Sequence, residues 1–115
     1  MKINIKRIYE TPDNKDGYRI LIDRLWPRGI AKTEAHIDEW IKEIAPSNEL
    51  RKWFGHQPEL FGEFSKKYKA ELKDKTELLS KIKSIAKKQT VTLLYGAKDT
   101  VHNQAVILQE VLNNA

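Results

Sequence analysis

The sequence predicts a small α/β protein with a mostly parallel, three-stranded sheet flanked by about five helices. Two observations support this fold class. Three short segments are rich in Ile, Val and Leu, whereas apolar residues recur at helical spacing through most of the rest of the chain. The order is two strands, four helices, a strand and a helix, so the last strand reaches the sheet through a long helical crossover, which favours parallel pairing. The length of 115 residues fits one domain over residues 1–115.

The strands are predicted over residues 2–8, 18–24 and 90–95. The second strand contains three successive apolar residues, Ile20 to Ile22, as is typical of a strand covered on both faces. Turn-forming residues at 11–17 connect the first two strands. Parallel crossovers usually need a dozen or more residues. The short connection therefore leaves both a hairpin and a very short crossover open.

The helices follow from apolar residues at i, i+3, i+4 and i+7 and from capping residues. The first is predicted over about Thr33–Ala45 and ends at Pro46. Ser47 can cap a short second helix to about Trp53, and Pro58 suits the first turn of the third. A fourth runs from about Thr76 to Lys87 and the last starts near Thr100. The predicted buried positions are Ile37, Trp40, Ile41, Ile44, Phe61, Phe64, Tyr68, Leu72, Leu78, Leu79, Ile82, Ile85, Val101, Ala105, Leu108 and Leu112.

The net charge of +5 is concentrated in residues 63–88, where nine lysines face four acidic residues; the rest of the chain holds twelve basic and twelve acidic residues. A basic surface attracts nucleic acid and other polyanions. The alternative is a lysine-rich helical face that contacts solvent and has no binding role. All nine residues are Lys, and Arg would be the better sign of specific phosphate or base recognition. The candidate nucleic-acid contacts are Lys66, Lys67, Lys87 and Lys88.

Several function classes are excluded or not expected. There is no cysteine, so disulfides, thiolate metal sites and cysteine nucleophiles are excluded. The sequence has neither a phosphate-binding glycine loop nor a dinucleotide fingerprint. Its histidines, His36, His56 and His102, lack metal-ligand spacing, so we expect no metal and no cofactor. No apolar run approaches the ~20 residues of a membrane span, and the N-terminus does not resemble a signal peptide. We therefore expect a cytoplasmic protein without membrane partners.

Two segments at predicted strand ends carry the side chains most suited to chemistry. These are residues 23–29 and 95–103, and ligands of open α/β sheets bind beyond the carboxyl ends of the strands. The second segment leads into a helix N-terminus, whose backbone amides favour anions. We predict an anion- or nucleotide-sized site between the two segments. Its candidate residues are Asp23 and His102 for proton transfer and Arg24, Trp26, Arg28, Lys98, Asp99 and Asn103 for binding.

Each candidate also has a structural interpretation. Asp23 could pair with a neighbouring arginine or cap a turn. Trp26 could belong to the core rather than serve as a substrate platform. Asp99 or Thr100 could be the N-cap of the last helix, and His102 could be a solvent-exposed side chain. The pair of segments is therefore more informative than any one of these residues.

The stretch Arg19–Gly29, with the sequence RILIDRLWPRG, resembles the YeaO-like branch of the bacterial domain-of-unknown-function 488 family. Further similar stretches lie at Trp40–Ser47, Leu50–His56, Phe64–Leu72 and 91–103, so the resemblance covers essentially the whole chain. It implies a compact α/β fold with a parallel sheet, and hence a short crossover between the first two strands. It implies no settled biochemical activity.

The chain departs from longer relatives at two places. Those relatives carry Asp-Val-Arg after the second strand, where this chain has Asp23-Arg24, and Cys-His-Arg at the start of the last helix, where it has Asn103-Gln104-Ala105. The missing cysteine and arginine argue against a thiol mechanism. Milder departures are Gln57, where Asp is usual, and Phe61, where Trp is usual.

The leading hypothesis is an uncharacterised bacterial protein, either a small enzyme or a ligand-binding domain, whose partner is a small anionic ligand. In this hypothesis Arg24 and Arg28 neutralise the anion, Asn103 and backbone amides bind it, and Asp23 or His102 moves a proton. The alternative is a nucleic-acid-binding accessory protein that uses the lysines of residues 63–88. A third hypothesis is an interaction module without chemistry. The sequence predicts neither the ligand's identity nor the oligomeric state.

Overall fold

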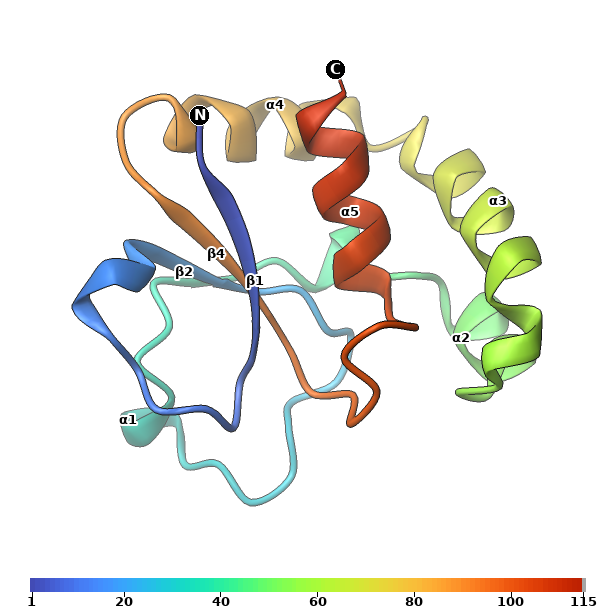
Figure 1. Cartoon of the computed structure of the whole chain (residues 1–115), viewed down its shortest axis with the longest axis horizontal. Helices are drawn as coiled ribbons and strands as arrows, with labels where there is room; N and C mark the ends of the chain where they lie inside the picture. Colours follow the sequence, from blue (N-terminus) through green and yellow to red (C-terminus); the bar gives the residue numbers. More distant parts are fainter. Residues whose placement is uncertain (115) are drawn as a thin grey trace.

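The computed structural model describes residues 1–114, in which four strands form one sheet in the order β1-β4-β2-β3 (Figure 1). The strands are β1 (Ile3–Arg7), β2 (Tyr18–Leu21), β3 (Glu39–Trp40) and β4 (Val91–Tyr95). All three pairings are parallel. The predicted parallel sheet is thus confirmed, but the predicted number of three strands is wrong because the two-residue β3 extends the edge.

Five α-helices accompany the sheet, as predicted. They are α1 (Lys32–Ala35), α2 (Asn48–Phe54), α3 (Phe61–Leu72), α4 (Thr76–Ala86) and α5 (Gln104–Asn113), with short 3-10 turns η1 (Asn14–Asp16), η2 (Lys42–Ile44) and η3 (Pro58–Leu60). Within residues 1–114, no helix is long and apolar enough to cross a membrane.

The two faces of the sheet are covered differently. Helices α2 to α5 gather around one face (Figure 1), where they form the larger core with inward strand residues such as Ile20, Val91 and Leu93. The other face carries Leu21 and Leu94. They pack with Ile8, which directly follows β1, and with apolar residues between β2 and the end of β3, namely Trp26, Ile30, Ile37 and Trp40. All five residues of β4 are buried, because this strand lies between β1 and β2 and is covered on both faces.

The predicted helix over Thr33–Ala45 is wrong. The helix α1 ends after one turn at His36, which adopts a left-handed backbone with φ of 51°. Asp38 then binds the edge of β2: its carboxylate accepts from the Arg19 amide at 2.8 Å and its amide donates to the Arg19 carbonyl at 2.8 Å. These bonds satisfy the open edge of β2 and hold the following residues extended. The apolar residues at helical spacing are divided between the two cores instead of sharing one helix face.

The chain's connections resolve the remaining predictions. β1 and β2 do not pair; they flank β4 as parallel strands, so their connection is a short crossover and not a hairpin. Ser47 caps α2, with its hydroxyl accepting from the Leu50 amide at 3.1 Å, as predicted. The last helix starts four residues later than predicted, at Gln104. Val101 therefore lies outside it and is exposed rather than buried.

Gly17 provides a test of the crossover. Its φ is 66°, and a Cβ there would lie 2.1 Å from the Thr90 carbonyl oxygen. We expect Gly17→Ala to lower the free energy of unfolding by about 3 kcal/mol or more, since strain and overlap with backbone add. Gly62→Ala is the matched control, because its Cβ would meet nothing within 4 Å; it should stabilise α3 by up to about 1 kcal/mol. Urea unfolding of both variants measures the difference, and equal stabilities would contradict the tight crossover.

Candidate functional site

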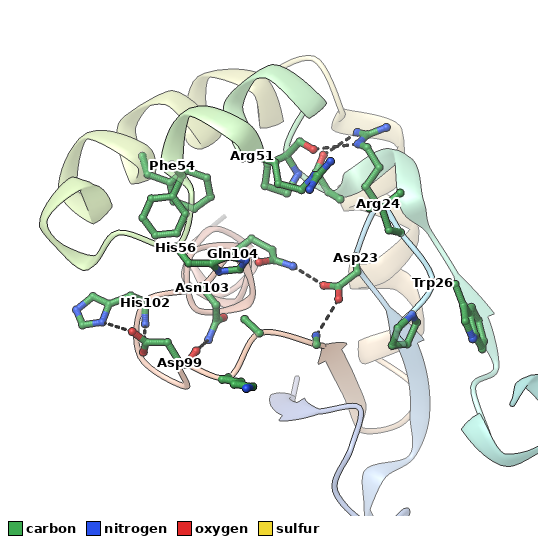
Figure 2. A pocket seen from close by; sticks show the side chains of 18 of the residues that line it. Asp23, Arg24, Trp26, Arg51, Phe54, His56, Asp99, His102, Asn103 and Gln104 are labelled. Atoms are coloured by element: carbon green, nitrogen blue, oxygen red, sulfur yellow. Dashed lines mark hydrogen bonds and ion pairs between the residues drawn. The ribbon is translucent and has the colours of Figure 1, made fainter. Parts of the chain in front are cut away.

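The two predicted segments meet at a pocket of about 570 Å³ beyond the carboxyl ends of β2 and β4 (Figure 2). They meet because β2 and β4 are parallel neighbours, so the segments that follow them leave the same edge of the sheet. A pocket of this volume lies within the range of small-molecule sites. The predicted candidates that line it are Asp23, Arg24, Trp26, Lys98, Asp99, His102 and Asn103.

Asp23 joins the two segments. Its Oδ2 accepts a hydrogen bond from the Gly96 amide at 2.8 Å, and its Oδ1 accepts from Gln104 Nε2 at 2.5 Å. Burial raises the pKa of the Asp23 carboxyl to about 6, although these two bonds and the charge of His56 act in the opposite direction. The carboxyl group can therefore exchange a proton near neutral pH. The alternative in which Asp23 pairs with an arginine does not hold within residues 1–114.

Gly96 makes this contact possible. A Cβ at this position would lie 2.9 Å from Asp23 Oδ2, closer than real Cβ contacts allow. The glycine at the end of β4 thus lets the backbone approach the carboxylate to hydrogen-bond distance. Sequence reasoning noted the glycine in this segment but not this role.

Two arginines lie together at one side of the pocket (Figure 2). Arg24 donates from Nε to the Pro46 carbonyl and from Nη2 to the Ala45 carbonyl, both at 3.0 Å. Arg51 comes from α2, and within residues 1–114 its side chain makes only one long hydrogen bond, of 3.4 Å from Nη2 to Asn48 Oδ1. Its Nε is buried and has no hydrogen-bond partner within the described residues. Neither guanidinium forms an ion pair in residues 1–114, so both charges are available to a ligand.

Asp99 and His102 form a second polar pair at the pocket. Asp99 accepts from the Val101 and His102 amides at 2.9 Å, and His102 Nδ1 lies 2.9 Å from Asp99 Oδ2. These hydrogen bonds lower the pKa of Asp99 to about 2, and the bond from the His102 amide is the largest cause. The carboxylate is therefore an acceptor, which places the proton of a neutral His102 ring on Nδ1. Phe61 packs edge-to-face against the ring, with centroids 5.2 Å apart.

Asn103 has a structural role. Its Oδ1 accepts from the Val106 amide at 3.2 Å and caps α5, and its Nδ2 donates to the Asp99 carbonyl at 2.9 Å. The N-cap is thus Asn103, and the prediction of Asp99 or Thr100 as the cap is wrong. Because Asn103 is buried and uses both ends of its amide within the chain, it positions the segment and leaves little for a ligand.

The other candidates divide between the pocket and the surface. Trp26 is half-buried; its Nε1 donates to the Ile30 carbonyl at 2.7 Å, and its ring meets Trp40 edge-to-face at 5.4 Å. Trp26 thus both lines the pocket and packs against the smaller apolar cluster of Ile8, Leu21 and Leu94. Lys98 is an exposed residue of the pocket lining. Arg28 is exposed and does not line the pocket, so the structure does not bring it together with Asn103 around this cavity.

Sequence reasoning missed Arg51, His56 and Gln104, all of which line the pocket. Arg51 and His56 come from α2 and the turn after it, not from a strand end. His56 is held in a left-handed conformation with φ of 57°, directly after Gly55 with φ of 54°. For a residue other than glycine this conformation is uncommon and marks a position to consider for function. The signal in the sequence was the family-specific stretch Leu50–His56, which contains two of the three.

The lysines proposed for nucleic acid are exposed but do not form one patch. Lys66 and Lys67 lie on α3, whereas Lys87 and Lys88 follow the far end of α4, on the opposite side of the molecule (Figure 1). Lys67 Nζ lies over the Trp53 ring, 4.4 Å from its centroid. Other lysines of the stretch pair with acids: Lys69 with Glu110, and Lys81 with Glu39.

Residues 1–114 contain no group of three or more His, Asp or Glu side chains placed to hold a metal ion. The polar groups of the pocket are instead two neighbouring arginines, the half-buried Asp23 carboxylate and one Asp–His pair. This arrangement can bind charged groups and exchange protons.

Comparison with known proteins places the chain in a family. The family model DUF488-N3i, described as the inactive DUF488-N3 subclade, matches residues 2–115, so the chain belongs to this family. The uncharacterized protein YeaO of Escherichia coli (strain K12) is 48% identical over 114 residues, which cover 99% of each chain. The uncharacterized protein Rv3073c of Mycobacterium tuberculosis is 38% identical over 112 residues, 97% of this chain and 94% of the relative. No solved structure matches the chain. The resemblance to the YeaO-like family is thereby confirmed.

The raised pKa of Asp23 makes stability depend on pH. Because the folded state binds this proton more tightly than the unfolded chain, with a pKa of about 6 against 3.8, the contribution of Asp23 to stability is greatest below about pH 4 and falls as pH rises to about 6. The loss should be on the order of 3 kcal/mol. Asp23→Asn, which cannot ionise, should not show it. Asp99 contributes stability that is lost as pH falls from about 3.8 to about 2, and this contribution is common to both proteins.

Urea unfolding of the wild type and Asp23→Asn at pH 4, 5, 6 and 7 measures this effect as the difference between two curves. Groups that titrate equally in both proteins cancel. A difference that stays constant across this range, or that grows in favour of the wild type with rising pH, would contradict a desolvated Asp23 carboxylate without a charged partner.

Proposed function

We propose that the pocket binds a small anionic ligand and that the two guanidinium groups of Arg24 and Arg51 are its principal binding groups. The observation that carries this proposal is the presence of both side chains at one pocket without an acidic partner. Guanidinium groups hold carboxylates and phosphates through paired N–H donors. Arg24 has five such donors and uses two on backbone carbonyls, which also fix its orientation.

Three further features support an anion. Arg51 Nε is buried without a partner, and a buried donor left unsatisfied costs free energy that an acceptor on a ligand would recover. Lys98 adds a positive charge at the exposed part of the lining. The volume of about 570 Å³ suits a ligand of nucleotide size.

Binding without covalent catalysis is the form of this function that we favour. The described lining of the pocket includes no serine, threonine or cysteine, and the family to which the chain belongs is described as inactive. Asp23 and the Asp99–His102 pair can exchange protons, and we assign them to ligand orientation.

Inorganic phosphate tests this proposal. At ten times its dissociation constant it should stabilise the folded protein by about 1.4 kcal/mol, which raises Tm by roughly 4–8 °C for a domain of this size. Arg51→Met keeps the apolar stem and removes the donors, so phosphate should bind at least about tenfold more weakly. Arg28→Ala is the matched control, because it removes an exposed arginine outside the pocket.

Differential scanning fluorimetry over a phosphate series, at constant ionic strength, gives the comparison. The proposal fails if phosphate does not raise Tm, or if Arg51→Met and Arg28→Ala lose the effect equally, since the latter result would indicate general attraction to positive charge.

The nucleic-acid function of Lys66, Lys67, Lys87 and Lys88 stays a prediction. One pair lies on α3 and the other just after α4, at opposite sides of the molecule (Figure 1). We therefore favour anion binding in the pocket over nucleic-acid binding.

A further inference from the structure

Asp23 presents a negative charge to the pocket that the protein itself does not neutralise. No lysine or arginine pairs with it in residues 1–114. Its two hydrogen bonds, from the Gly96 amide and Gln104 Nε2, occupy one position on each oxygen. An ionised carboxylate has about four acceptor positions, so about two remain for a ligand.

The positive and negative groups of the pocket are held apart. Asp23 and Arg24 are adjacent in the sequence, but the Arg24 guanidinium is held by the carbonyls of Ala45 and Pro46. The Asp23 carboxylate points instead toward Gly96 and Gln104 (Figure 2). The pocket therefore has an anion-binding side and a separate acceptor that faces the same cavity.

A ligand with negative charge alone fits this arrangement poorly. It would satisfy the arginines but would leave the half-buried Asp23 charge without a charged partner, where further donors would stabilise the carboxylate. The charge of His56 acts on Asp23, but His56 makes no hydrogen bond to it within the described residues. A donor on the ligand would fill the two free acceptor positions directly.

We propose that the ligand is bipolar: its anionic group binds Arg24 and Arg51, and an N–H donor group binds the Asp23 carboxylate beside Gln104. This inference rests on the proposed function and adds the chemistry of the ligand's other end. An amine cation and the amino edge of a neutral heterocycle both supply such a donor.

Two matched pairs of phosphate compounds test the inference. 2-Aminoethyl phosphate and propyl phosphate have nearly the same shape, and only the first carries an ammonium group. Guanosine 5′-monophosphate and inosine 5′-monophosphate differ by one amino group on the base. We expect the amino member of at least one pair to bind at least about tenfold more tightly, as a charge-assisted hydrogen bond would give. The pair that shows the preference identifies the source of the donor.

Asp23→Asn assigns the preference to this residue. The Asn amide keeps the shape of the side chain. Its oxygen can still accept from the Gly96 amide, and its nitrogen can donate to Gln104 Oε1 once the Gln104 side-chain amide has rotated. In this variant the amino preference should fall to less than about twofold, while inorganic phosphate binds as well as before or better because a negative charge has been removed. A preference that persists in Asp23→Asn would overturn the assignment.

The outcomes separate the two proposals. Loss of phosphate binding in the wild type overturns the proposed function, and the present inference with it. Phosphate binding without any amino preference overturns only the present inference. If Asp23→Asn does not fold, the backbone amide resonance of Gly96 replaces it: 2-aminoethyl phosphate should shift this resonance and propyl phosphate should not. Equal shifts would contradict contact of the amine with Asp23.

Discussion

The carboxylate of Asp23 is the interaction on which the pocket depends. It connects the end of β2 to the end of β4 through the Gly96 amide and to the first residue of α5 through Gln104. Three elements, of which β2 is far in the chain from β4 and α5, thus share one acceptor group. The group is half-buried, and its partial desolvation makes ionisation unfavourable compared with an exposed carboxylate; the two donors offset only part of that cost.

The parallel sheet explains why this connection can form. β4 lies between β1 and β2, and all its residues are buried. The parallel pairing brings the segments after β2 and β4 to one edge of the sheet. Gly96 then permits a contact that a side chain would block, and the Asn103 cap fixes where α5 begins. The site therefore depends on the parallel sheet topology and on two local features, the glycine at position 96 and the Asn103 cap.

The sequence allowed the pocket's strand-end components to be predicted. Neighbouring parallel strands end at the same edge of the sheet, whichever side chains they carry. The position of Asp23, Arg24 and Asp99 after predicted strands is therefore enough to predict that they line the site. Arg51 and His56 could not be found in this way, because α2 reaches the pocket through packing on α3 rather than through a strand. Arg28 was included because it stands in the same segment as Asp23, but its side chain is exposed outside the pocket.

The error over residues 33–45 has a similar cause. The segment has apolar residues at helical spacing, at Ile37, Trp40, Ile41 and Ile44. Such spacing reports only the local preference of the chain. The bonds between Asp38 and Arg19 are not local, and they satisfy backbone groups of β2 that a helix would have left open. Non-local pairing thus overrode the local pattern, and the same pairing added the fourth strand.

The measurement that tests this account most directly is a nuclear magnetic resonance titration of the side-chain carboxyl carbons in the free protein. It follows each aspartate separately, so Asp99 serves as an internal reference. The account predicts a pKa of about 6 for Asp23 and about 2 for Asp99. A pKa of Asp23 at or below the ordinary 3.8 would contradict it, since the carboxylate would then already have, within the protein, the stabilisation that we assign to a donor on the ligand.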